Sequence, residues 1–81
     1  MKTPAWVVRK VHPNLDYSLL LTFANGEKRV YDARPLLNED IYSQLRNPEF
    51  FLKARAECGT VVWSDDVDIA PEHLYESSVR V

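Results

Sequence analysis

Apolar and polar residues alternate along the first part of the chain in the pattern typical of β-strands. Three runs are rich in leucine, β-branched and aromatic side chains, which favour extended backbone. They span residues 5–12, 17–23 and 27–32. Residues typical of turns separate them, Pro13-Asn14 after the first run and Asn25-Gly26 after the second. We therefore expect three consecutive antiparallel strands.

The pairing of the second and third strands depends on the turn at Asn25-Gly26. A two-residue turn needs positive φ at both central residues, which Asn and Gly tolerate best, and it would set Leu21 opposite Val30. A three-residue loop with Gly26 in a bulge would instead set Leu21 opposite Arg29. Because the two-residue turn matches apolar partners, we expect that register.

The apolar spacing changes to a helical period in the middle of the chain. Leu37, Ile41 and Leu45 recur at every fourth residue, which predicts one apolar face of an α-helix. Asn38 is a suitable cap for this helix, and Asn47-Pro48 ends it.

Shorter elements follow. We expect a short helix over residues 48–53, strands over 54–58 and 60–64, a turn at Asp65-Asp66 and a helix from Pro71 to about Ser77. The sequence thus predicts an α+β fold, in which a small antiparallel sheet of about five strands packs against one or two short helices. The expected order is β-β-β-α-β-β-α, in a single domain spanning residues 1–81.

Composition and charge narrow the classes of function. The net charge of −2 disfavours non-specific binding to nucleic acid or to an anionic membrane, both of which need an excess of basic residues. Only Arg9-Lys10 and Lys28-Arg29 are adjacent basic pairs. Cys58 is the single cysteine, so no internal disulfide is possible. Without a long apolar segment, we expect a cytoplasmic protein.

Two features could carry chemistry. The acidic turn Asp65–Asp68 offers carboxylates to a hard cation, although counting from Asp66 the calcium-loop positions for Gly and Glu hold Pro71 and Ser77. Cys58 could act as a nucleophile if a histidine lay beside it. Neither His12 nor His73 has the spacing of a zinc motif. We expect no cofactor, no metal and no catalytic residue.

A contact surface is the other candidate. Asp32 and Arg34 stand two residues apart beside Tyr31, where they could bind a partner or fix the loop, and Arg34 could pair with the acids of the later turn. Trp63 is a large anchor of the kind common at interfaces. The residues that we expect at this surface are Tyr31, Asp32, Arg34, Trp63, Asp65 and Asp66.

The order of these motifs resembles the bacterial domain of unknown function 2442 over residues 6–76. The similarity rests on the runs LTFANGEKRVYD, IYSQLRNPEFF and TVVWSDDVDIAPEHLYE, above all on Trp63, Asp68, Ile69, Pro71, Glu72, Leu74 and Tyr75. It implies a compact α+β domain and brings no established catalytic residues. Some relatives are fused to a helix-turn-helix domain, and others are encoded beside a second small protein.

We therefore expect a non-enzymatic protein-interaction module with a protein partner or self-association. It could be one component of a two-protein regulatory or toxin-antitoxin-like system. The alternative is a small enzyme or metal-binding protein that uses the Asp65–Asp68 turn or Cys58.

Overall fold

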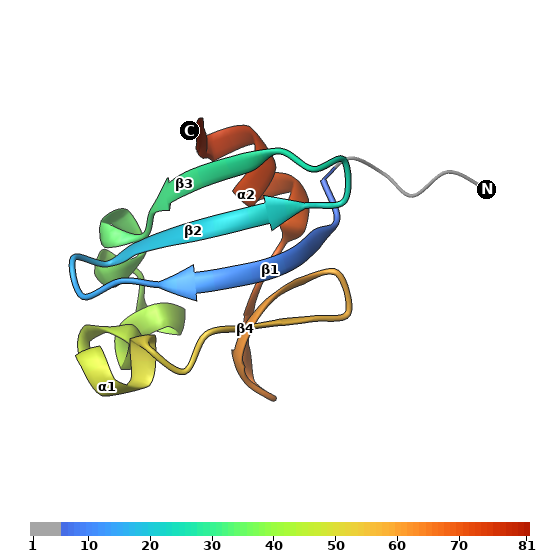
Figure 1. The fold of residues 1–81 in the computed structure, drawn as a ribbon. Helices are drawn as coiled ribbons and strands as arrows, with labels where there is room; N and C mark the ends of the chain where they lie inside the picture. The colour runs from blue at the N-terminus through green and yellow to red at the C-terminus, as the bar shows by residue number, and fades with distance from the viewer. Residues whose placement is uncertain (1–5) are drawn as a thin grey trace.

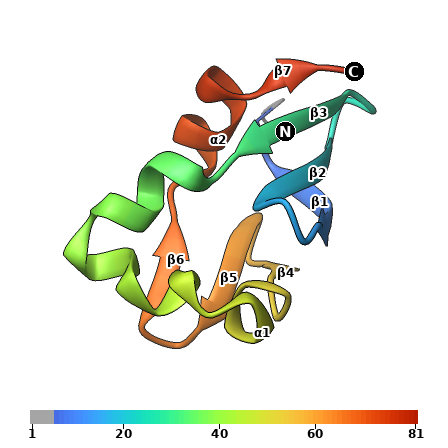
Figure 2. The same cartoon turned by 90° about the vertical axis from the view of Figure 1, so that its left-hand side faces the viewer.

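Two antiparallel sheets share one hydrophobic core in the computed structural model, which describes residues 6–81 (Figures 1 and 2). The first sheet has the strand order β1-β2-β3-β7 and the second β4-β5-β6. The strands are β1 (Val8–Pro13), β2 (Ser18–Phe23), β3 (Lys28–Asp32), β4 (Arg55–Glu57), β5 (Thr60–Ser64), β6 (Val67–Ile69) and β7 (Val79–Arg80). The backbone amide of Val8 donates to the carbonyl of Gly59 at 2.9 Å and joins the sheets.

Four helical segments complete the fold of residues 6–81. They are the 3₁₀ helices η1 (Arg34–Asn38) and η2 (Asp40–Arg46) and the α-helices α1 (Pro48–Phe51) and α2 (Pro71–Ser77). The α+β class is confirmed, whereas the single sheet of about five strands is wrong. The Asp65-Asp66 turn leads into β6, a strand of three residues that is too short to be recognised from the sequence pattern. A further edge strand, β7, follows α2. Residue 5, where the first strand was expected to begin, lies outside the described residues.

The second and third strands pair in the register of the three-residue loop, with Leu21 opposite Arg29. The two-residue turn is therefore wrong. The backbone amide of Gly26 donates to the carbonyl of Phe23 at 2.9 Å. The backbone amide of Phe23 donates to the carbonyl of Glu27, also at 2.9 Å. Gly26 alone in this loop has positive φ, +86°, so Asn-Gly serves here as the end of a bulged loop.

Tyr17 occupies the equivalent position in the preceding hairpin loop, with φ of +66°. The left-handed region costs a non-glycine residue about 1–2 kcal/mol. Two contacts hold Tyr17 there: its hydroxyl donates to the carbonyl of Arg46 at 2.7 Å, and its ring centroid lies 4.8 Å from that of Phe51. The strained loop thereby ties the first hairpin to η2 and α1.

The prediction of an α-helix from apolar residues at every fourth position is wrong. The chain instead forms the 3₁₀ helices η1 and η2, which have three residues per turn. Leu45 is buried but Ile41 is 73% exposed. Glu39 separates the two segments with an extended backbone, φ −100° and ψ 134°, and Asn38 caps neither.

The later helices follow the sequence prediction more closely. The side chain of Asn47 accepts a hydrogen bond from the amide of Glu49 at 3.0 Å and caps α1. The last helix, α2, runs from Pro71 to Ser77, as expected.

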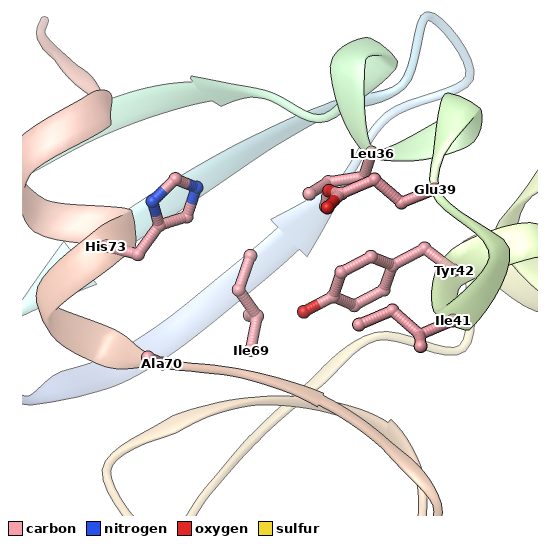
Figure 3. Close-up of a pocket in the computed structure, with 7 residues that line it drawn as sticks. All are labelled: Leu36, Glu39, Ile41, Tyr42, Ile69, Ala70 and His73. Carbon is pink, nitrogen blue, oxygen red and sulfur yellow. The ribbon is translucent and has the colours of Figure 1, made fainter.

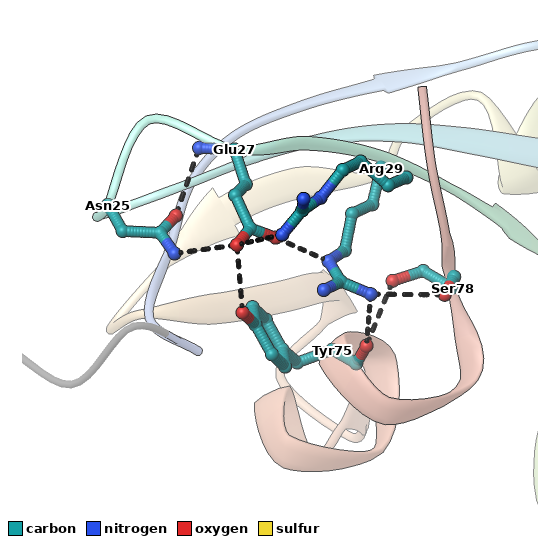
Figure 4. A network of polar contacts seen from close by, with 6 residues as sticks. Asn25, Glu27, Arg29, Tyr75 and Ser78 are labelled. Atoms are coloured by element: carbon teal, nitrogen blue, oxygen red, sulfur yellow. Dashed lines mark hydrogen bonds and ion pairs between the residues drawn. The ribbon is translucent and has the colours of Figure 1, made fainter.

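An ion-pair network fixes α2 to one face of the first sheet (Figure 4). Nε of Arg29 lies 2.8 Å from a carboxylate oxygen of Glu27, and its guanidinium lies 4.1 Å from the ring centroid of Tyr75. Arg29 also donates to the backbone carbonyls of Tyr75 and Ser78 at the end of α2. The hydrogen bond that Arg29 donates to the carboxylate of Glu27 lowers the pKa of Glu27.

The opposite face of the first sheet is not covered by any helix or strand of residues 6–81 (Figure 1). Directly opposed residues on antiparallel strands point to the same face. The strand registers therefore place one row across all four strands, made of His12, Leu20, Val30 and Val79. Within this row Val79 is 71% exposed and Val30 38%.

Candidate functional site

A groove lies between the 3₁₀ segments and α2 (Figure 3). It consists of two adjoining hollows, of about 250 Å³ and about 360 Å³, which share Leu36, Glu39 and His73. The other lining residues are Ile41, Tyr42, Ile69 and Ala70 in the first hollow, and Tyr31, Asp32, Pro35 and Ser77 in the second.

The base of the groove is apolar. Leu36 and Ile69 are each 4% exposed and belong to the hydrophobic core. Ile41 stands at the open side, where most of its side chain meets solvent. A hollow with an apolar base and a few polar groups along its walls is the usual form of a binding site, and Ile41 extends the apolar surface toward solvent.

A tyrosine–histidine pair crosses the second hollow. The hydroxyl of Tyr31 lies 3.0 Å from Nε2 of His73, and Oγ of Ser77 lies 3.5 Å from Nδ1 of the same ring. Burial, followed by the nearby Tyr42 and the negative charges of Glu39 and Asp32, raises the pKa of Tyr31 to about 12. The phenol is therefore neutral at physiological pH.

Tyr42 forms the opposite wall. Its hydroxyl donates to the backbone carbonyl of Asp68 at 3.1 Å, which joins η2 to β6. Burial raises the pKa of Tyr42, with smaller contributions from Glu39 and Asp68. The carboxylate of Glu39 points between Tyr42 and His73 (Figure 3), and no hydrogen bond or ion pair joins it to any side chain of residues 6–81.

Two of the six residues expected at a contact surface line this groove, Tyr31 and Asp32. Arg34 forms an ion pair with Asp32 at 2.9 Å, and its backbone amide donates to the same carboxylate at 3.0 Å. The hydrogen bonds with Arg34 lower the pKa of Asp32. This pair fixes the loop after β3, and the expected pairing of Arg34 with the later acidic turn does not occur.

Trp63 lies in the core and not at a surface, which corrects the expectation from sequence. Its side chain is 2% exposed, and its indole N–H donates to the backbone carbonyl of Phe51 at 3.0 Å. The inward face of β5 carries Trp63 against α1 because side chains alternate along a strand. Asp65 and Asp66 are exposed in the turn between β5 and β6 and do not line the groove.

The residues expected to carry chemistry are dispersed. Cys58 is exposed in the turn between β4 and β5, and no hydrogen bond links it to a histidine within the described part of the chain. Over residues 6–81, no three His, Cys, Asp or Glu side chains gather closely enough to hold a metal ion. In the same range, each helix is too short or too polar to cross a membrane.

Sequence reasoning missed Glu39, Ile41, Tyr42 and His73 as site residues. Leu36, Glu39 and Tyr42 recur at intervals of three, the period of a 3₁₀ helix, which would have indicated that they lie near one another. That signal is weaker than the four-residue spacing that predicts an α-helix. His73 had no signal, because its partner Tyr31 is 42 positions away.

Comparison with known proteins gives one match. The family model described as "Protein of unknown function (DUF2442)" matches residues 8–80. No curated protein and no solved structure matches the chain.

Proposed function

We propose a protein-interaction role for this chain, which belongs to the DUF2442 family, a family of unknown function. In this proposal the protein is a non-enzymatic module, and the groove between η1–η2 and α2 receives part of a protein partner. The observation that carries the proposal is the exposure of Ile41, at 73%, beside a hollow whose base is formed by Leu36 and Ile69.

Burial of such a side chain by a partner is the usual source of interface affinity. A fully buried isoleucine contributes about 1.5–3 kcal/mol through removal of apolar surface from water. The polar groups that line the groove, Glu39 and the Tyr31–His73 pair, would add orientation rather than affinity. The outer row of the first sheet is a weaker candidate, because Val30 within it is only 38% exposed.

The proposal extends to the setting of this interaction. This chain is one component of a two-protein regulatory or toxin-antitoxin-like system in the bacterial cytoplasm, and the partner is the other. This part of the proposal rests on the resemblance between the sequence motifs and the family. The alternative of a small enzyme or metal-binding protein at Cys58 or the Asp65–Asp68 turn has no supporting contact within residues 6–81.

The test is affinity purification of the tagged chain from its native host in three forms: unmodified, Ile41→Asp and Leu15→Asp. Leu15 is 75% exposed in the first hairpin loop, so Leu15→Asp is a matched control that removes an exposed apolar side chain outside the groove. We expect a stoichiometric partner with the unmodified chain and Leu15→Asp, and binding at least about tenfold weaker with Ile41→Asp.

Two results would contradict the proposal. One is a chain that emerges alone under mild conditions in every preparation. The other is a partner that Ile41→Asp retains as well as Leu15→Asp does. Circular dichroism of both variants establishes that neither substitution unfolds the chain, since both side chains are exposed.

A further inference from the structure

The charged groups that line the groove are unequal in their pairing. Asp32 is neutralised by Arg34 at 2.9 Å. Glu39 is exposed and has no such partner among residues 6–81, and none of the lysines and arginines in that range lines either hollow. The groove therefore presents one carboxylate that no positive charge within the described part of the chain neutralises.

The pKa values of the neighbouring Tyr31 and Tyr42 also reflect the negative charge of Glu39. Burial is the main reason that the pKa values of Tyr31 and Tyr42 are raised, and the negative charge of Glu39 contributes to both shifts. A positive charge placed beside the carboxylate of Glu39 would be attracted to it.

The walls around Glu39 suit the side chain of a basic residue. The aliphatic stem of an arginine or lysine can lie along apolar surface while its charged end reaches a polar group. Ile41 and Leu36 supply the apolar surface, and the ring of Tyr42 supplies an aromatic face that attracts a cation. The planar guanidinium also matches a carboxylate with two parallel hydrogen bonds.

We propose that the groove recognises a protein segment that presents an apolar side chain beside a basic one, with Glu39 as the carboxylate that binds the basic group. The apolar side chain contacts Ile41 and the base of the hollow. This inference rests on the proposed function, because it names the chemistry that the same groove selects in a partner.

The direct test is nuclear magnetic resonance titration of the ¹⁵N-labelled chain with two blocked dipeptide amides. One is acetyl-Leu-Arg-amide, and the other replaces arginine by citrulline, which has nearly the same shape but no charge. We expect saturable amide shifts in residues 36–42 and 69–73. The citrulline peptide should bind about two- to fivefold more weakly, which is the contribution of an exposed ion pair.

Variants then assign the effect to one carboxylate. Glu39→Gln should remove the difference between the two peptides, whereas the matched control Asp66→Asn, outside the groove, should leave it unchanged. Several results would overturn the inference: equal binding of the two peptides, shifts confined to residues 64–67, or no groove shift at millimolar peptide. Argininamide alone binding as tightly as the dipeptide would also overturn it, because it would identify a site for a small cation.

The inference and the proposed function can fail separately. If Ile41→Asp releases the purified partner but Glu39→Lys does not, the groove is a contact surface but Glu39 does not bind a basic residue of the partner. If neither variant releases the partner, the groove itself is not the contact surface. Release of the partner by both variants supports both the proposed function and the role of Glu39.

Discussion

The hydroxyl of Tyr31 lies 3.0 Å from Nε2 of His73 and joins β3 to α2 across the groove. Tyr31 is 4% exposed, so the hydrogen bond forms away from most solvent. Hydrogen bonds of this kind contribute about 1 kcal/mol to folding stability. The groove is thus built on a contact between two elements that are distant in sequence, and its shape depends on the sheet and the helix together.

We expect stability to fall in strong alkali because of Tyr31. Its pKa rises from 10.0 to about 12 on folding, so the phenol of the unfolded chain ionises first. The contribution is fully present below the unfolded pKa and is lost as the pH rises through the folded one, by about 2 kcal/mol. Urea unfolding of the unmodified chain and of Tyr31→Phe across this range measures the loss.

Tyr31→Phe should show a smaller fall over the same range, because the titrating group is absent. At neutral pH the same variant should be about 1 kcal/mol less stable, since the hydrogen bond with His73 is gone. An identical alkaline slope for the two proteins would mean that Tyr31 does not titrate in this way.

Trp63 should matter for stability and not for binding. Trp63→Phe removes the indole N–H that donates to the carbonyl of Phe51 and leaves a cavity, so we expect a loss of about 2–4 kcal/mol. Trp6, which is partly exposed, provides the matched control in Trp6→Phe. Chemical denaturation followed by circular dichroism compares them, and losses of equal size would be inconsistent with the buried position of Trp63.

Cys58→Asn should stabilise the turn between β4 and β5. Cys58 has φ of +53° and Gly59 has φ of +81°, the conformation that Asn-Gly adopts most readily. We expect a gain of about 0.5–1 kcal/mol in the free energy of unfolding. Cys58→Val should be less stable than the unmodified chain, because a β-branched residue tolerates positive φ poorly. Thermal unfolding under reducing conditions measures both, and a gain from valine would contradict the explanation.

The elements that were predicted correctly have local causes. Proline at the start of α2, the Asn47 cap of α1 and the β-branched run of β5 each act within a few residues. The register of β2 and β3 could not be fixed in the same way, because Asn25-Gly26 favours a two-residue turn but can also end a bulged loop. Packing decides it, since the observed register sets Arg29 on the face where α2 lies.

The groove was less predictable than the fold. Ile41 fits the apolar face of an α-helix, yet it is exposed because η2 is a 3₁₀ helix that follows the extended residue Glu39. The tryptophan that sequence reasoning assigned to a surface is in the core, because a two-sheet fold encloses β5. Only Tyr31 and Asp32 of the expected surface line the groove, and their neighbour His73 comes from a helix far along the chain.

Amide hydrogen exchange of the chain, alone and in complex with its purified partner, tests the central claim most directly. If the groove is the contact surface, exchange should slow in residues 36–42 and 69–77 when the partner is bound, and it should stay unchanged in the row of the outer sheet face at Leu20 and Val30. Protection of that row, or of the turn at Asp65-Asp66, with no change along the groove would contradict it.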